Sequence, residues 1–114
     1  MPLIYKICPD ALWSEAEAKG RFDGAPIDLA DGYIHFSTGA QVAETAAKHF
    51  AGQERLLLIA IDDGRLGSEL RYEPSRGGAL FPHLYASLDP KVVRWIAPML
   101  LKADGSHTLP ETLA

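Results

Sequence analysis

This sequence lacks the patterns that indicate disulfide bonds, a targeting leader or a membrane span. Cys8 is the single cysteine, so an internal disulfide is excluded and the cytosol is the default location. The first residues lack a basic region followed by an apolar run, and no apolar run approaches the ~18 residues of a membrane helix. We interpret Cys8 as a small, buried apolar side chain on the first strand.

The sequence also lacks any cluster of lysine and arginine. The formal net charge is −4, whereas nucleic-acid-binding domains usually carry a basic stripe. An acidic chain has no electrostatic attraction to a phosphate backbone. We therefore expect neither a nucleic-acid partner nor a membrane partner, and the oligomeric state stays open.

The chain has enough apolar material for one domain. It holds 114 residues, of which 47% are hydrophobic and 23% charged, as in an ordinary globular protein. We expect a single domain over residues 1–114, with a core of about 3–101 and a polar, frayed tail at 102–114.

Hydrophobic periodicity predicts an α+β fold, with two helices packed on a mainly antiparallel sheet. The first predicted helix covers 11–19, and the second begins near Gly39 and ends by Gly52. A loop is expected at 24–31. The predicted strands are 3–8, 33–37, 56–61, 69–73, 80–88 and 92–101. The strand at 56–61 is apolar on both faces, which is typical of a central strand covered on both sides.

The segment 31–41 carries the clearest functional signal. It reads as a turn, a short strand with a histidine, and the start of a helix. Strand alternation places Ile34 and Phe36 on one face, and Tyr33, His35 and Ser37 on the other. The first face can be buried while the second presents an imidazole between two hydroxyl-bearing side chains. This pattern predicts a small-molecule pocket without identifying a reaction.

A candidate anion site follows the histidine strand directly. Thr38 and Gln41 have the spacing of a capping box, with Gly39 at the first helical position. The first backbone N–H groups of a helix lack partners within the helix and attract anions. We therefore expect an anion pocket at the start of the second helix, a few residues from His35.

Three motifs together resemble a known family. They are I-Y-K-I at 4–7, D-G-Y-I-H-F-S-T at 31–38 followed by Gln41 and Thr45, and F-P-H-L-Y at 81–85. This pattern resembles the uncharacterised bacterial family catalogued as domain of unknown function 952, over roughly 3–98. The resemblance implies a fold similar to the ADP-ribosyltransferase superfamily, whose members bind NAD in the cleft of a split β-sheet. NAD is a candidate cofactor on this ground alone.

The same resemblance suggests roles for individual residues. The segment at 33–37 is similar to the V-H-L-S strand of RNA 2′-phosphotransferases, in which His35 would match a histidine that contacts the NAD ribose. Two departures are visible. Transferases with a His-Tyr-Glu pattern place the histidine on the first strand, where this chain has Tyr5 and Lys6. The phosphotransferases carry several site arginines, whereas only Arg71 and Arg76 lie near a motif here.

These observations define a candidate site. We predict His35 and Glu73 as catalytic residues, because an oxocarbenium-like centre needs a nearby carboxylate. The predicted ligand-binding residues are Tyr33, Ser37, Thr38, Arg76, His83 and Tyr85. Three of these residues also have a purely structural interpretation. His35 can bond a backbone carbonyl, His83 can join a half-buried aromatic cluster, and Arg76 can be a solvated loop residue.

Three functions remain open at this point. The first is an enzyme of ADP-ribosyltransferase type that takes an NAD- or ADP-ribose-related nucleotide. The second is a metal site of two histidines and a carboxylate, from His35, His83 and Glu73, although no close HxH or HxxxE spacing supports it. The third is a non-catalytic ligand-binding or interaction module that uses the anion pocket.

Overall fold

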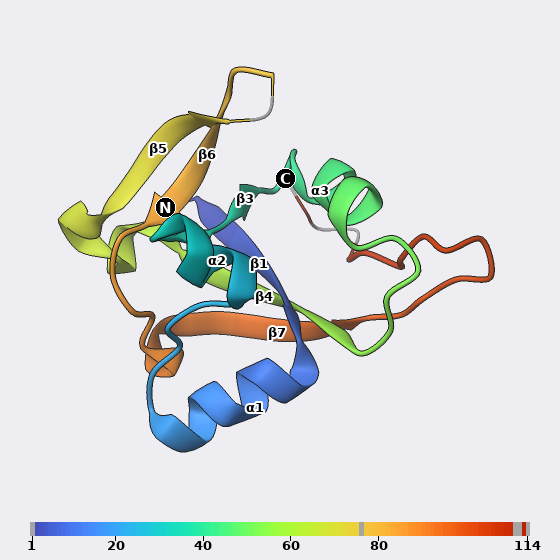
Figure 1. Cartoon of the computed structure of the whole chain (residues 1–114), viewed down its shortest axis with the longest axis horizontal. Coiled ribbons are helices and arrows are strands. Elements are labelled where there is room, and N and C mark those ends of the chain that lie inside the picture. The colour runs from blue at the N-terminus through green and yellow to red at the C-terminus, as the bar shows by residue number, and fades with distance from the viewer. Residues whose placement is uncertain (1, 76, 111–112, 114) are drawn as a thin grey trace.

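The structure is a computed structural model that describes residues 2–75, 77–110 and 113. Within these residues the chain forms three α-helices, three short 3-10 turns and two antiparallel sheets (Figure 1). The α+β class predicted from periodicity is therefore confirmed. The helices are α1 (Asp10–Lys19), α2 (Pro26–Asp31) and α3 (Val42–His49). The strands are β1 (Leu3–Pro9), β2 (Ile34–His35), β3 (Ser37–Thr38), β4 (Leu56–Asp62), β5 (Leu70–Ser75), β6 (Ala79–Leu84) and β7 (Val93–Met99).

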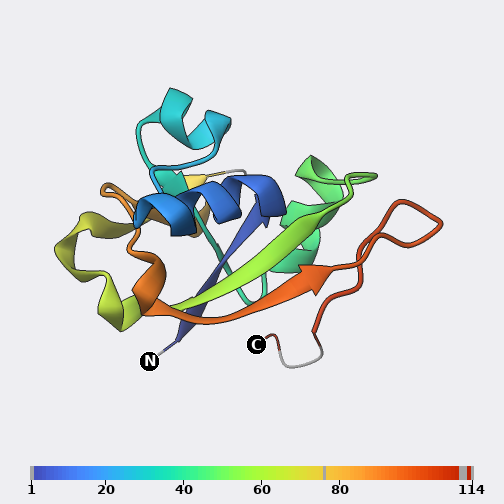
Figure 2. The same ribbon diagram turned by 90° about the horizontal axis from the view of Figure 1, so that it is seen from below.

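The larger sheet has the strand order β3-β1-β4-β7 and forms the centre of the molecule (Figure 2). Four consecutive residues of β4, 58–61, are fully buried, as predicted for a central strand. One face packs against α1 through Trp13 and Ala16, and the other against α3 through Val42 and Ala46. The apolar run of β4 is thus explained by helices on both faces of the sheet.

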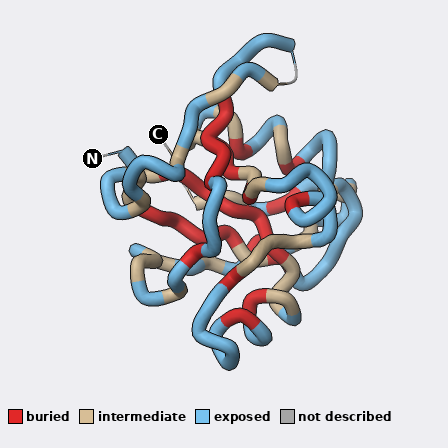
Figure 3. The backbone as a smooth tube through the Cα atoms, turned by 60° about the vertical axis from the view of Figure 1, so that its left-hand side comes forward, coloured by how far each residue is buried: buried red, intermediate tan, exposed pale blue. Residues whose placement is uncertain are grey.

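The smaller sheet has the order β2-β6-β5, and β5 and β6 extend from the body as an arm (Figure 1). Burial is concentrated in the centre of the molecule, while the tip of this arm is exposed (Figure 3). The chain passes from the smaller to the larger sheet at Phe36, whose N–H donates to Pro82 O at 2.9 Å. Ile34 and Phe36 are each 2% exposed, which confirms the predicted buried face of the histidine strand.

Two local predictions are wrong at this junction. The expected loop at 24–31 contains α2, because Pro26 is preorganised for a first helical turn and Asp28 accepts the Ala25 N–H at 2.8 Å. The following helix, α3, begins at Val42 rather than near Gly39. Gln41 Oε1 does accept the Thr38 N–H at 3.0 Å, but this bond closes a turn before the helix.

Two side chains also face differently from the prediction. The alternation of residues 69–73 predicts that Tyr72 points inward together with Leu70, yet Tyr72 is 41% exposed, because β5 is the edge strand of the projecting arm. Its hydroxyl donates to Asp63 at 2.8 Å, and burial followed by this hydrogen bond raises the pKa of Tyr72 to about 12. The helical spacing of Val42, Ala46 and His49 predicts that His49 shares the apolar face of α3, but His49 is exposed.

Residues 101–108, which follow β7, are folded back on the body rather than frayed. Leu101 pairs with His107 in an antiparallel bridge, and the Lys102 N–H donates to Ser106 O at 2.8 Å. His107 is buried, and its Nε2 lies 2.8 Å from the carbonyl oxygen of Gln53. These contacts tie 101–108 to the loop that follows α3.

Two predictions drawn from absent features can be compared with the structure. Cys8 is fully buried on β1, and burial raises the pKa of its thiol to about 11, as suits a packing role. In the part of the chain that the structure describes, no helix is long and apolar enough to cross a membrane.

Candidate functional site

The structure gathers histidine, tyrosine and glutamate side chains on the smaller sheet. We name the group of Tyr33, His35, Glu73, His83 and Tyr85 the Tyr33 cluster. The register of β2 and β6 sets His35 directly opposite His83, with ring centroids 5.5 Å apart. The Tyr33 ring lies 4.6 Å from that of His35, 4.2 Å from that of His83 and 5.1 Å from that of Tyr85.

The inner half of the cluster, around His35, is held by the buried carboxylate of Asp28. His35 Nδ1 lies 2.6 Å from Asp28 Oδ1, and the His35 backbone N–H donates to the same oxygen at 3.1 Å. Lys6, a charged residue on the otherwise apolar β1, donates to both oxygens of Asp28 at 2.8 and 3.0 Å. The side chain of Asp28 is fully buried and that of Lys6 is 5% exposed. The larger sheet thus reaches the site through Lys6.

Asp28 stays ionised in this environment. Burial by itself raises the pKa of its carboxyl, but hydrogen bonds from His35 and Lys6 and the Lys6 charge outweigh burial and hold that pKa at about 2. The other ring nitrogen of His35, Nε2, lies 3.0 Å from Asp31 Oδ2 at the end of α2. His35 therefore has a carboxylate against each nitrogen.

The outer half of the cluster is arranged around Glu73. Its Oε1 accepts a hydrogen bond from the Tyr85 hydroxyl at 2.7 Å and lies 2.8 Å from His83 Nδ1. These bonds, that of Tyr85 first, lower the pKa of Glu73, and the bond to Glu73 raises the pKa of Tyr85. The Arg71 guanidinium lies 5.0 Å from the centre of the Tyr85 ring. Glu73 is thus an anion at neutral pH with two neighbours that can donate hydrogen bonds.

A shallow cavity of about 290 Å³ borders the cluster. It lies between α2 and the residues that follow β6, and Tyr33 and Tyr85 form part of its wall beside Leu29. Asp23 and Ser87 line it as well, and Ser87 Oγ donates to Asp23 at 2.6 Å. The cavity offers aromatic and apolar surface next to hydrogen-bond acceptors.

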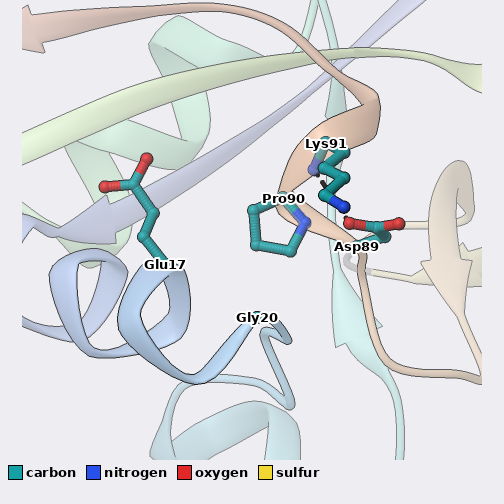
Figure 4. A pocket seen from close by; sticks show the side chains of 5 residues that line it. All are labelled: Glu17, Gly20, Asp89, Pro90 and Lys91. Carbon is teal, nitrogen blue, oxygen red and sulfur yellow. Dashed lines mark hydrogen bonds between the residues drawn. The ribbon is translucent and has the colours of Figure 1, made fainter.

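A second hollow of about 280 Å³ lies between the end of α1 and the 3-10 turn Pro90–Val92 (Figure 4). Glu17, Gly20 and Lys91 line it, and the Lys91 N–H donates to Asp89 at 2.9 Å. None of the residues predicted from sequence lies there, so we give it no functional role.

Two predicted residues, Ser37 and Thr38, do not join the cluster. Ser37 is buried on β3, and its hydroxyl lies 3.0 Å from that of Thr45 on α3. Thr38 pairs with Ile4 of β1, on the larger sheet. Both follow the crossing at Phe36, so they leave the strand of His35. Arg76 lies outside the described residues.

The start of α3, where the anion pocket was predicted, is built differently from the expectation. Gln41 precedes the helix, and its Nε2 donates to Leu80 O of β6 at 2.8 Å. The first helical turn carries Glu44, whose charge opposes anion binding.

Comparison with known proteins places the chain in a family. Residues 7–96 match a family model described as "Protein of unknown function (DUF952)". The chain belongs to this family. The matched span includes the Tyr33 cluster, and it confirms the family resemblance drawn from the motifs.

Solved structures of a similar protein exist. The crystal structure of CC0527 from Caulobacter crescentus is 51% identical over 97% of each chain, with a TM-score of 0.93. The solution NMR structure of CC0527 is 52% identical over 100% of this chain and 98% of that chain, with a TM-score of 0.88. No curated protein matches the sequence.

Sequence reasoning missed three charged residues of the site, Lys6, Asp28 and Asp31, and it noted Arg71 only as an arginine near a motif. Lys6 did carry a signal, because a lysine in the middle of an apolar strand needs a buried partner. Asp28 carried none, because its segment read as a loop.

The alternative metal site of His35, His83 and Glu73 is not matched by the geometry of the described residues. Among residues 2–75, 77–110 and 113, no group of three or more histidine, cysteine, aspartate or glutamate side chains is placed to hold a metal ion. Both nitrogens of His35 face aspartates instead, and His83 Nδ1 faces Glu73.

Proposed function

We propose that the Tyr33 cluster is the binding and reaction site of a small enzyme of ADP-ribosyltransferase type, acting on an NAD- or ADP-ribose-related nucleotide. The observation that carries the proposal is the meeting of His35, Glu73 and His83 beside the rings of Tyr33 and Tyr85, which are tilted at 39° to one another. Aromatic faces suit a planar ring, and aspartate, serine and histidine atoms suit ribose hydroxyls.

Two further features support this assignment. The division into two antiparallel sheets, with the histidine strand at their junction, agrees with the split sheet that the resemblance implies. An ionised Glu73 would stabilise the positive charge that develops at the ribose carbon when a glycosidic bond to nicotinamide breaks. His35 would contact the ribose, as the similarity at 33–37 implies.

Titration with NAD and with ADP-ribose, followed by calorimetry and by nicotinamide release, tests the proposal. We expect binding of both ligands and release of nicotinamide from NAD that is lost in His35→Ala and in Glu73→Gln. His49→Ala is the matched control, because His49 is an exposed histidine on α3, a helix that packs on the larger sheet.

Other outcomes would redirect the proposal. Binding of ADP-ribose without nicotinamide release would favour the non-catalytic module. In that case, NMR shifts at the amides of Gly39 and Ala40 would place the ligand at the start of α3, and shifts at Tyr33 and Tyr85 would place it at the cluster. Absence of binding to either nucleotide would overturn the proposal.

A further inference from the structure

The hydrogen-bond geometry around Asp28 restricts which ring nitrogen of His35 can do chemistry. An ionised carboxylate only accepts hydrogen bonds, and the pKa of Asp28 is about 2. The His35 nitrogen that faces it, Nδ1, lies 2.6 Å from Oδ1. Nδ1 must therefore carry a hydrogen for this contact to be favourable.

Asp28 is itself held in place from several sides. Lys6 donates to both of its oxygens, the Ala25 N–H donates to Oδ2, and the His35 N–H donates to Oδ1. With the side chain fully buried, a rotation of the carboxylate would break several of these bonds at once without replacement by water. The orientation of the His35 ring is fixed to the same degree.

We infer that Asp28 is a positioning residue that holds His35 as the Nδ1–H tautomer, which leaves Nε2 as the ring atom that exchanges a proton with the ligand. The part of this inference that concerns the ligand rests on the proposed function, while the tautomer does not. Nδ1 is unavailable to a ligand because Asp28 is buried on that side of the ring.

The surroundings of Nε2 agree with this role. A ring with both hydrogens donates to a carboxylate at each nitrogen, since Asp31 Oδ2 lies 3.0 Å from Nε2. When the ring holds one hydrogen, the shorter contact to the fully buried Asp28 keeps it on Nδ1, and Asp31, whose side chain is 42% exposed, can turn toward solvent. The remaining groups around the ring are Tyr33, which directly precedes β2, and His83 on β6, whose Nδ1 contacts Glu73. Lys6 stands behind Asp28 on β1.

NMR spectroscopy of the wild-type protein tests the tautomer directly. Long-range ¹H–¹⁵N correlation spectra of the histidine rings, recorded at a pH where the rings are neutral, distinguish the nitrogen that carries hydrogen from the one that does not. We expect His35 to show hydrogen on Nδ1 and a lone pair on Nε2. His107 is the internal control with the opposite expectation, because its Nε2 faces the Gln53 carbonyl at 2.8 Å. A neutral His35 with hydrogen on Nε2 would overturn the inference.

Two variants separate positioning from a merely structural role. In Asp28→Ala, no acceptor remains beside Nδ1, so we expect the hydrogen to shift to Nε2, where Asp31 can accept it. In Asp31→Asn, a change at a half-exposed side chain, we expect the Nδ1–H form to persist. A folded Asp28→Ala protein with the wild-type tautomer, or an Asp31→Asn protein that switches tautomer, contradicts the inference. If Asp28→Ala does not fold, the wild-type and Asp31→Asn spectra still decide.

Addition of ADP-ribose to the same sample completes the test. Under both proposals, the Nε2 resonance of His35 shifts while that of Nδ1 is less affected. Absence of any shift, with Nδ1–H retained, removes the proposed ligand and leaves the assignment of the tautomer intact. A shift confined to Nδ1 contradicts the assignment of Nε2 as the reacting atom.

Discussion

The two carboxylate–histidine pairs of the site differ in their surroundings. In the inner pair, Asp28 and His35, the carboxylate is fully buried and bonded to a buried lysine. In the outer pair, Glu73 and His83, the histidine is buried while the carboxylate is 32% exposed and bonded to an exposed tyrosine. The inner pair is therefore anchored in the core through Asp28 and presents only the His35 ring, which is 23% exposed, whereas the outer pair presents its carboxylate. Substitutions at equivalent atoms should separate these roles.

The largest expected effect is that of Asp28→Asn on stability. The substitution leaves Lys6 charged and buried without an anionic partner, and breaking a buried ion pair in this way costs about 3–5 kcal/mol. Urea unfolding at pH 7 measures the loss, with Glu73→Gln as the matched control at the outer pair. Equal stability losses in the two variants would refute the distinction between the pairs.

Neighbouring residues of the histidine strand provide the next comparison. Phe36→Ala removes a side chain that is 2% exposed in the core, and we expect a loss of about 3–5 kcal/mol. His35→Ala removes a side chain that is 23% exposed and bonded to charged groups, and we expect roughly 1.5–3 kcal/mol. Unfolding curves of both proteins measure the difference. A silent Phe36→Ala together with an unfolded His35→Ala protein would mean that the two faces are reversed.

Acid unfolding isolates the contribution of the inner pair. The pKa of Asp28 is about 2 in the folded protein and ~3.9 for an aspartate in an unfolded chain. Because the folded value is the lower one, the stabilisation is present above pH ~4 and is lost as the pH falls toward 2, by roughly 2 kcal/mol. Stability measured from pH 6 to 2 should fall less steeply in Asp28→Asn than in the wild type. Parallel curves would show that Asp28 is not the source of this slope.

The smallest effect on stability is expected for Glu73→Gln at the outer pair. The glutamine can still accept from Tyr85, and the position is open to water, so the midpoint of unfolding should move little. Nicotinamide release should nevertheless fall to background, because the negative charge is lost. A normal rate of release in this variant would exclude Glu73 as the catalytic carboxylate.

The alternation of side chains in 33–37 shows which features of the site the local sequence predicts. Ile34 and Phe36 are buried and His35 faces Tyr33, as the alternation predicts, because a strand presents successive side chains to opposite faces. The pattern fails at Ser37, which lies on another sheet. The switch from β2 to β3 depends on the partners that β1 and β6 supply from distant parts of the chain.

The sequence by itself determined the α+β class, the doubly covered β4 and the burial of Cys8, because each follows from apolar side chains within a few residues of one another. Only the tertiary structure decided the inner half of the site. Lys6 and Asp28 are 22 residues apart, and their ion pair forms because the fold brings Asp28 of α2 between Lys6 of β1 and His35 of β2. A lysine within an apolar strand indicates that a buried anionic partner is needed, but which of the fifteen acidic residues becomes that partner depends on tertiary packing.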